Sequence, residues 1–219
     1  MSENLQEHNI NVTKTARYYT LGDISNTEEV WVVCHGQGQL ASYFIKSFQN
    51  IVKEKRLIVA PEGLSRFYLD NMGGRVGACW MTREDRLNEI DNYVNYLDLI
   101  YEQIIASVNN PNIKLQVLGF SQGVATVCRW VGLGKPKPID KLILWGGITP
   151  PDLDLVAANS IFSHLKLFLV VGNQDQFADA SVVAHEEERL KNDNLSYKLI
   201  TYEGGHQLNI EVIKDLAEC

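Results

Sequence analysis

Six short apolar runs recur along this chain, and most of them are continuous rather than alternating with polar residues. The runs are 30–34, 57–60, 115–120, 141–146, 167–172 and 197–202. Strands buried on both faces of a parallel sheet have this pattern, whereas strands with one solvated face alternate. A further run at 17–22 is expected to add an edge strand. The sequence therefore predicts an α/β fold with a mostly parallel central sheet.

The segments between these runs have the periodicity of helices. The clearest is 83–108, where apolar residues from Leu87 to Val108 recur three or four apart and form one stripe that we interpret as core packing. Other helices are expected at 40–53, 122–133, 179–192 and 207–217. Strands and helices alternate as in an open α/β sheet, and we see no linker. We therefore predict a single α/β domain at 17–219, preceded by a polar N-terminal tail at 1–16.

The charge of the chain limits its partners. Its 219 residues carry a net charge of −7 at pH 7, whereas binding to nucleic acid or to an anionic membrane requires clustered Lys and Arg. A neutral or apolar small-molecule substrate fits better, and no nucleic-acid partner is expected. No uncharged apolar run reaches the ~18 residues of a membrane span, and the N-terminus lacks the pattern of a signal peptide. We predict a cytoplasmic protein without integral membrane association.

A glycine-rich turn, HGQGQLA at 35–41, follows the first core strand. Gly36, Gly38 and Ala41 have the G-x-G-x-x-A spacing of a dinucleotide-binding turn, and Glu62, about 20 residues further on, would be the ribose ligand. This interpretation predicts a nucleotide-dependent oxidoreductase. The alternative is a loop whose backbone amides hold a different group.

The pentapeptide Gly119-Phe120-Ser121-Gln122-Gly123 is G-x-S-x-G, placed directly between an apolar run and a helical segment. This is the context of a nucleophile elbow, a sharp strand-to-helix turn that exposes a serine hydroxyl. Residues two positions before and after the serine press against neighbouring backbone, so only very small side chains fit there. The amide of Gln122 begins the helix and points toward developing negative charge. We interpret Ser121 as a nucleophile, and the alternative is a glycine-bracketed turn without chemistry.

A serine nucleophile needs a base, and the base needs a group that fixes its tautomer. His206 follows the last apolar run, at the carboxyl end of a strand, where open α/β sheets place their sites. Its alternative role is that of a loop histidine that caps the final helix. Three other histidines are interpreted as surface residues: His8, His164 and His185.

Asp175 is our candidate for the acid, because it lies three residues beyond the run at 167–172 and again at the carboxyl end of a strand. The chain order of Ser121, Asp175 and His206 is the serine, acid, histidine order of α/β-hydrolases. Other candidates for the acid are Asp179, which is also suited to cap a helix, Asp152 and Asp154.

The connection at 61–82 is unusually long, with 22 residues, four glycines and no clear periodicity. Loops longer than about 12–15 residues are commonly functional or disordered, and the aromatic content of this one argues against disorder. Trp80 and Met81 form a wall for an acyl chain in one interpretation. In the other, they pack the loop onto the sheet.

Other site motifs are incomplete. HEEER at 185–189 lacks the second histidine of H-E-x-x-H, and GLGKPK at 132–137 lacks the first glycine and the hydroxyl residue of a P-loop. The acidic run at 186–188 is interpreted as a solvated helix face. The four cysteines lack the spacing of a zinc site or a disulfide framework. Acyl transfer through a serine needs neither a metal nor a cofactor, so none is expected.

The chain resembles the phospholipase/carboxylesterase family of α/β-hydrolases, which includes the acyl-protein thioesterases. The resemblance covers roughly 30–208 and depends on HGQGQ, PEG, GGRVGACW, LGFSQG, WGGITPP, GNQDQF and EGGH. It implies an α/β-hydrolase fold, with helices on both faces of the sheet.

By position, the resemblance implies that Ser121 is the nucleophile, Asp175 the orienting acid and His206 the base. It also implies an oxyanion hole made by the backbone amides of Gln37 and Gln122, with His35 and Gly36 shaping the first loop. Two positions depart from the family pattern: Val124 stands where a second glycine is common, and Met81-Thr82 replaces an aromatic-acidic pair near the expected acyl pocket.

These expectations describe a serine hydrolase that cleaves carboxylic esters or thioesters through an acyl-enzyme. Carboxylesterase, lysophospholipase and acyl-thioesterase activities all stay open, as do the acyl length, the oligomeric state and a lid role for 61–82. The first rival is the nucleotide-dependent oxidoreductase that uses the turn at 36–41. The second is a non-catalytic α/β-hydrolase relative that binds ligands or protein partners.

Overall fold

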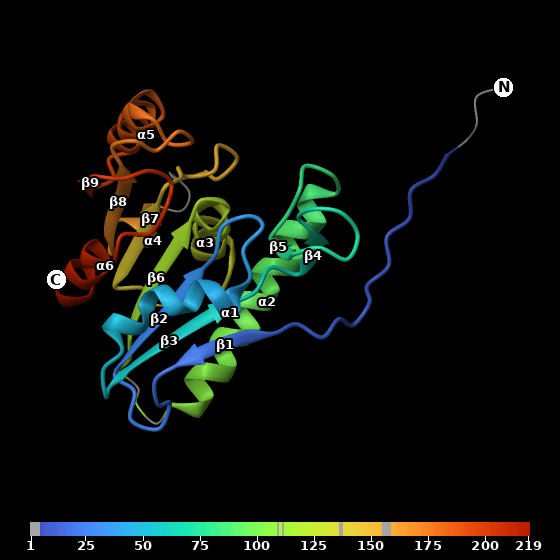
Figure 1. Ribbon diagram of the computed structural model, residues 1–219, viewed down its shortest axis with the longest axis horizontal. Coiled ribbons are helices and arrows are strands. Elements are labelled where there is room, and N and C mark those ends of the chain that lie inside the picture. The colour runs from blue at the N-terminus through green and yellow to red at the C-terminus, as the bar shows by residue number, and fades with distance from the viewer. Residues whose placement is uncertain (1–4, 109, 111, 136–137, 155–158) are drawn as a thin grey trace.

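The structure is a computed structural model that describes residues 5–108, 110, 112–135, 138–154 and 159–219. Its centre is a seven-stranded sheet in the order β1-β3-β2-β6-β7-β8-β9 (Figure 1). All neighbouring strands are parallel except β1, which runs antiparallel to β3 at the edge. The strands are β1 (Tyr18–Leu21), β2 (Glu29–Cys34), β3 (Arg56–Pro61), β6 (Lys114–Phe120), β7 (Lys141–Trp145), β8 (Lys166–Gly172) and β9 (Tyr197–Tyr202). The predicted sheet, with an edge strand before the six core runs, is confirmed.

Helices cover both faces of this sheet. Alternate residues of a strand point to opposite sides, so apolar side chains on both sides need cover. In β2, Val30 and Val32 enter a core that α2 and α3 complete, whereas Trp31 and Val33 enter a second core with α1, η1 and α6. The helices are α1 (Ala41–Phe44), the 3₁₀ helix η1 (Ile45–Ile51), α2 (Arg86–Ser107), α3 (Gln122–Leu133), α4 (Asn159–Phe162), α5 (Ala180–Asn192) and α6 (Ile210–Glu218). The inner strands β3, β2, β6, β7 and β8 are therefore buried on both faces, which explains their continuous apolar sequences, whereas the edge strands β1 and β9 are partly exposed.

The predicted helices form, with two differences. The segment expected as one helix at 40–53 is a short α-helix that continues as a 3₁₀ helix. In α2, most of the predicted apolar stripe is buried, from Ile90 to Ile104, but Leu87 is 70% exposed. The expectation for Leu87 was wrong, because it lies in the first turn of the helix, before the buried part of the stripe begins.

The long connection at 61–82 contains regular structure that its sequence did not reveal. Strands β4 (Ser65–Tyr68) and β5 (Val76–Cys79) form an antiparallel hairpin beside the main sheet (Figure 1). The hairpin is fixed to the glycine-rich turn, because Gly38 N donates to Ala78 O at 2.8 Å and Ala78 N donates to Gln39 O at 3.1 Å. A Cβ at Gly77 would lie 2.4 Å from Gly38 O, so this contact requires glycine. The hairpin and the turn therefore form one connected wall.

Residues 5–16 form no helix or strand, and in Figure 1 they lead away from the sheet before β1. The ammonium of Lys14 donates to the carbonyl of Leu64, next to β4. The division into a tail at 1–16 and a domain at 17–219 stays a prediction. Within the described residues, no helix is both long and apolar enough to cross a membrane.

Candidate active site

Ser121 stands between the last residue of β6 and the first residue of α3, with φ 53° and ψ −117°. Such a backbone conformation is strained for a residue with a side chain. A Cβ at Gly119 would lie 2.3 Å from Gly123 O, and a Cβ at Gly123 would lie 2.2 Å from Cys34 O. Glycine is therefore a steric requirement at both positions, as the sequence predicted.

His206 and Asp175 meet at the carboxyl edge of the sheet, after β9 and β8. His206 Nδ1 lies 2.7 Å from Asp175 Oδ2, and the Asp175 side chain is fully buried. The other carboxylate oxygen, Oδ1, accepts hydrogen bonds from the amides of Phe177 at 2.8 Å and Ala178 at 3.0 Å. Because Asp175 Oδ2 accepts a hydrogen bond from Nδ1–H, Nε2 of a neutral His206 is left as an acceptor.

Two aromatic rings hold the imidazole of His206. The ring centroid of Phe120 lies 4.9 Å away and that of Phe177 lies 4.8 Å away. Phe120 immediately precedes Ser121, and it is buried, whereas Phe177 is 67% exposed. The imidazole thus contacts both the residue before the elbow and a solvent-facing ring.

The end of β7 connects the elbow with the His206–Asp175 pair. Ser121 N donates to Trp145 O at 2.8 Å. A Cβ at Gly146, which has φ +60°, would lie 3.1 Å from His206 Nδ1 and 3.2 Å from Asp175 Oδ2. The carboxyl ends of β6, β8 and β9 therefore bring Ser121, Asp175 and His206 to the same edge of the sheet, with β7 between β6 and β8.

The glycine-rich turn lies against Ser121, since a Cβ at Gly36 would come within 3.2 Å of Ser121 Cβ. The turn is braced from inside: Gly36 N donates to Gln39 Oε1 at 2.8 Å. Within the described residues, no hydrogen bond from the amide of Gln37 is present. The amide of Gln122 opens α3, so it has no partner within the helix. Both amides are available to an anion.

His35 is buried beneath this turn and has a structural role. Its Nδ1 lies 2.7 Å from Gly36 O, and its Nε2 accepts from Gly63 N at 3.0 Å. One ring nitrogen therefore donates while the other accepts, which is the pattern of a neutral imidazole. Burial lowers the pKa of His35, which favours the same neutral form.

The side chain of Gln122 fixes the end of the long connection, a role that the sequence did not suggest. Its Oε1 accepts from Trp80 N at 3.0 Å and its Nε2 donates to Met81 O at 2.8 Å. Trp80 is only 1% exposed, and its indole donates to His35 O at 2.8 Å. Trp80 thus packs the connection onto the sheet, the second of the two interpretations.

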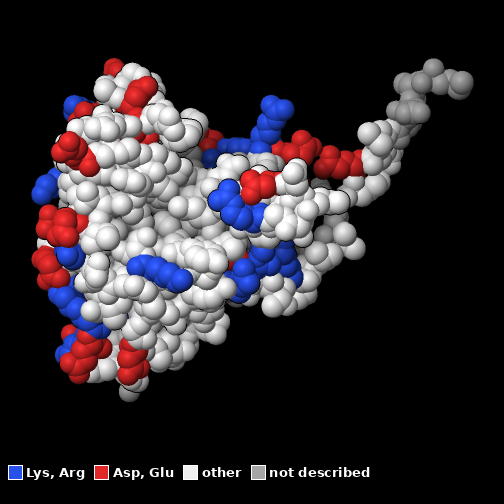
Figure 2. All heavy atoms as spheres, in the orientation of Figure 1, with Lys and Arg blue, Asp and Glu red and all other residues white. Residues whose placement is uncertain are grey.

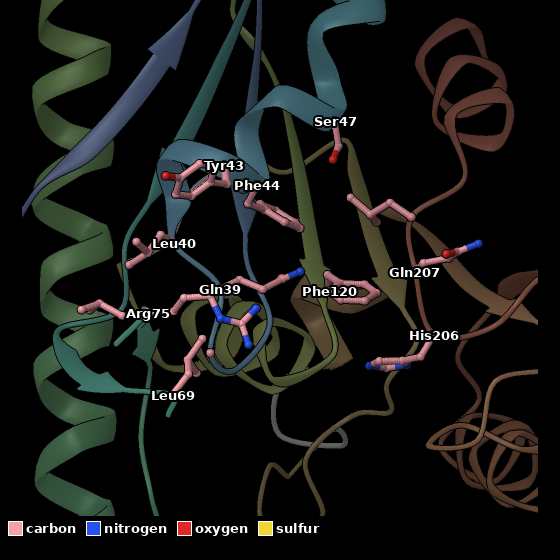
Figure 3. Close-up of a pocket in the computed structure, with 13 residues that line it drawn as sticks. Gln39, Leu40, Tyr43, Phe44, Ser47, Leu69, Arg75, Phe120, His206 and Gln207 are labelled. Atoms are coloured by element: carbon pink, nitrogen blue, oxygen red, sulfur yellow. The ribbon is translucent and has the colours of Figure 1, made fainter. Parts of the chain in front are cut away.

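A cavity of about 620 Å³ opens beside His206 (Figure 3). His206, Gln207 and Leu208 form one side, and the hairpin residues Leu69, Arg75 and Val76 form the other. The remaining lining residues are Gly38, Gln39, Leu40, Tyr43, Phe44, Ser47 and Phe120. Trp80 and Met81, the pocket residues expected from the sequence, are not among them, and Met81 instead contacts Arg129. The volume is that of a small-molecule site.

The other candidate acids have different partners. Asp179 caps α5, accepting at Oδ1 from the amides of Ser181 and Val182. Asp152 accepts from Arg129 at 2.6 Å and pairs with Arg86 at 2.5 Å. Asp154, like His8, His164 and His185, is exposed to solvent.

The carboxylate of Glu62, the ribose ligand in the oxidoreductase interpretation, is fully buried and already paired. Its Oε1 accepts from Arg17 and from Arg66, each at 2.7 Å. Its Oε2 accepts from the amide of Ala41 at 3.3 Å. Glu62 therefore joins the N-terminal segment and the hairpin to the glycine-rich turn.

Glu186 corrects another expectation, because it is 1% exposed rather than part of a solvated helix face. Its Oε1 accepts from the amide and the hydroxyl of Thr149 at 2.9 and 2.6 Å. Arg189, one turn further along α5, donates to the carbonyls of Thr149, Pro150 and Leu153. The run of charged residues predicted a solvated face, but α5 places Glu186 and Arg189 against the loop after β7. Among the described residues, no group of three His, Cys, Asp or Glu is placed to hold a metal ion.

Known proteins resemble this chain in sequence pattern and in fold. The sequence profile described as phospholipase/carboxylesterase matches residues 22–219. Esterase PE8 has a TM-score of 0.71 and 19% identity, covering 94% of this chain and 97% of its own. Acyl-protein thioesterase 2 from Zea mays has a TM-score of 0.70 and 18% identity, covering 93% and 97%. A phospholipase/carboxylesterase from Dyadobacter fermentans has a TM-score of 0.66 and 19% identity, covering 96% and 98%. No curated protein matches the sequence.

Proposed function

This chain belongs to the phospholipase/carboxylesterase family of α/β-hydrolases, and we propose that it is a serine hydrolase that cleaves carboxylic esters or thioesters. In this proposal Ser121 is the nucleophile, His206 the general base and Asp175 the acid that orients it. Membership of a phospholipase/carboxylesterase family supports ester hydrolysis, and the reaction, the three residues and their roles are our proposal. The substrate is a small-molecule or acyl-chain ester.

One observation carries the proposal: the 2.7 Å contact between His206 Nδ1 and a buried Asp175 carboxylate, beside a serine in a strained strand-to-helix turn. An imidazole held in this tautomer presents Nε2 as the acceptor for a serine proton. The elbow glycines and the end of β7 bring Ser121 to the same edge of the sheet. These features support catalysis better than either rival function.

The reaction has two half-reactions with balanced proton transfers. Ser121 Oγ attacks the carbonyl carbon while its proton passes to His206 Nε2, and the carbonyl oxygen becomes an oxyanion. The carbon–oxygen or carbon–sulfur bond to the leaving group then breaks, and the leaving group takes the proton from Nε2. Water repeats the sequence on the acyl-enzyme and releases the carboxylic acid and free Ser121. Asp175 stabilises the imidazolium that forms twice in each cycle.

The oxyanion is held by the amides of Gln37 and Gln122 in this proposal. Gln122 N lies at the N-terminus of α3, where the partial positive charge of a helix is greatest. Gln37 lies in a turn that is braced by Gln39 and by the hairpin, so its amide needs no rearrangement to act. Removing one such donor typically costs about 10²- to 10³-fold in turnover.

Labelling with a fluorophosphonate tests this proposal, because such probes bond covalently to activated serines. We expect the wild-type protein to be labelled at Ser121, with the modified peptide identified by mass spectrometry, and S121A to stay unlabelled. An unlabelled wild-type protein would favour the non-catalytic binding protein. For the oxidoreductase, NAD or NADP is titrated while intrinsic fluorescence is followed, and we expect no saturable change, since Glu62 is already paired with Arg17 and Arg66.

A further inference from the structure

The cavity beside His206 has a cation on one wall. Among the described residues that line it, Arg75 alone has a side chain that is permanently charged at neutral pH. In Figure 3 its guanidinium lies over the cavity, near Gln39 and Leu69 and across from His206. A positive group at this position contrasts with the net charge of −7 of the whole chain. The charge of the cavity therefore differs from that of the molecule.

The guanidinium of Arg75 is only partly used within the protein. Its Nε pairs with Asp70 Oδ2 at 3.1 Å, and the two side chains are 80% and 53% exposed. In the part of the chain that the structure describes, neither terminal nitrogen of this guanidinium has a hydrogen-bond partner. Exposed ion pairs of this kind contribute little to stability. Arg75 can therefore offer two parallel N–H donors to a carboxylate, the geometry in which arginine binds it most strongly.

The backbone fixes Arg75 relative to Ser121. Leu69 N donates to Arg75 O at 2.8 Å across the hairpin. The hairpin is in turn hydrogen-bonded to the glycine-rich turn through Gly38 and Ala78, and that turn lies against Ser121. The main chain of Arg75 is thus held relative to Ser121 by hydrogen-bonded backbone rather than by a free loop.

The reaction direction decides which part of a substrate reaches Arg75. In the proposed mechanism His206 gives its proton to the leaving group, so the leaving group lies at the His206 side of the cavity. An acyl chain that extends from there across the cavity reaches the hairpin. Between the two sides the lining is largely apolar, with Leu40, Phe44 and Phe120 among its residues. An acyl chain would thus cross an apolar stretch before it meets the guanidinium.

We propose that Arg75 selects acyl groups that end in a carboxylate, so that the preferred substrates are monoesters or monothioesters of dicarboxylic acids. This inference depends on the proposed hydrolase function and adds the chemistry of its acyl group. It modifies the expectation of a neutral or apolar substrate, which came from the net charge of the chain. The apolar part of that expectation still holds for the middle of the acyl chain.

Matched substrate pairs test this inference. The 4-nitrophenyl monoesters of adipic, suberic and sebacic acids are compared with the esters of the same length that end in a neutral primary amide. We expect kcat/KM of the wild-type protein to favour the carboxylate of the best-fitting length by about two- to fivefold, because the Arg75 side chain is 80% exposed and an exposed ion pair is screened by solvent. The ratio of the two kcat/KM values should fall to about one in R75Q. It should rise in D70N, which removes the competing carboxylate.

R83Q is the matched control, because Arg83 is also exposed and carries the same charge but does not line the cavity. It should keep the wild-type ratio. A wild-type ratio near one, or a preference that persists in R75Q, would overturn the role of Arg75 while leaving the hydrolase function intact. A preference only for an anion on the leaving group, measured with 3-carboxy-4-nitrophenyl esters, would overturn the acyl assignment. If the wild-type protein hydrolyses neither ester and is not labelled by the fluorophosphonate, the hydrolase function itself fails.

Discussion

Asp175 Oδ2 lies 2.7 Å from His206 Nδ1, although the two residues are 31 positions apart in the sequence. Their strands, β8 and β9, are parallel neighbours, and Gly172 pairs with Tyr202 at the last step of the register. Asp175 lies three residues beyond Gly172, and His206 lies four residues beyond Tyr202. Because the carboxyl ends of parallel strands share one edge, loops of nearly equal length bring the two side chains together.

Replacement of Asp175 tests which acid orients the histidine. D175A should lower kcat by about 10⁴-fold, because His206 loses the group that fixes its tautomer. D179A and D152A are the controls, since Asp179 caps α5 and Asp152 pairs with Arg86 and Arg129. Both should keep most of the activity at a temperature where they are folded. A major loss confined to D152A would show that a different strand supplies the acid.

Phe177 is expected to support the imidazolium of His206. Its ring centroid lies 4.8 Å from that of His206, and a cation beside an exposed aromatic face gains about 0.5–1 kcal/mol. F177L keeps an apolar side chain without the ring, so kcat should fall by about two- to fivefold, whereas F177Y should stay close to the wild type. Equal kcat values for F177L and the wild-type protein would show that the ring has no such role.

The elbow should not tolerate a methyl group at Gly123. G123A places a Cβ 2.2 Å from Cys34 O and 2.8 Å from His35 O, both in fixed backbone. We expect a loss of about 3 kcal/mol or more in the free energy of unfolding, with loss of activity. G73A is the control, because its Cβ would meet nothing within 4 Å and only the left-handed φ of +91° opposes it. Urea titration of G73A should show a loss of about 1–2 kcal/mol in the free energy of unfolding.

Asp152 should make the fold sensitive to acid. Burial opposes its ionisation, but the hydrogen bonds from Arg129 and Arg86 outweigh burial and lower the pKa of Asp152 to about 2 from the ordinary 3.8. A carboxylate with a lowered pKa in the folded state stabilises the fold above its unfolded pKa, and this contribution is lost as the pH falls through the folded pKa.

Between about pH 4 and pH 2, the wild-type protein should therefore lose about 1 kcal/mol more unfolding free energy than D152N, since partial exposure screens the pair. Urea titrations of both proteins across this range measure the difference. If the free energy of unfolding changed with pH by the same amount in both proteins, the assigned role of Asp152 would be contradicted.

The candidate catalytic positions could be predicted from the sequence because each depends on a local pattern. Gly119 and Gly123 are needed because a side chain at either position would clash with nearby backbone, and both lie two residues from Ser121. Asp175 and His206 each follow an apolar run directly, so the parallel sheet predicts their common edge. The candidate site thus follows from turn chemistry and topology, both of which leave short-range signals.

The long connection was harder to interpret, because its structure depends on contacts far away in the sequence. The hairpin β4–β5 has exposed residues on both strands, and it is stabilised by pairing with the glycine-rich turn at Gly38 and Gln39. Trp80 packs beneath His35 instead of facing the cavity, held by an elbow side chain 42 residues away. Such partners leave no periodic signal within the segment itself.

The prediction that Glu186 faces solvent was wrong for a related reason. A run of three glutamates on a helix is usually solvated, but the loop after β7 covers one of them and supplies the two hydrogen bonds of Thr149. Arg75 belongs to the motif GGRVGACW, but nothing in the sequence indicated a role for its side chain. Its position became informative only when the hairpin placed it across a cavity from His206 (Figure 3).

The face of the molecule seen in Figure 2 carries few charged side chains near its centre. Much of this centre is uncharged, with basic side chains on it, and acidic residues lie along the left edge and beside the N-terminal segment (Figure 2). A substrate with an apolar middle could approach this face without desolvating many ionic groups. In our proposal, Arg75 on the hairpin wall then decides selectivity at the end of the acyl chain.

The claim that Ser121 is the nucleophile is tested most directly by the turnover of S121A. Initial rates are measured with a 4-nitrophenyl ester and with an acyl thioester of the same acyl chain, on wild-type and S121A protein of equal thermal midpoint. We expect the wild-type protein to turn over at least one of these substrates and S121A to lose about 10⁴- to 10⁶-fold in kcat. An S121A protein that retains more than a few per cent of the wild-type rate would contradict the proposed mechanism.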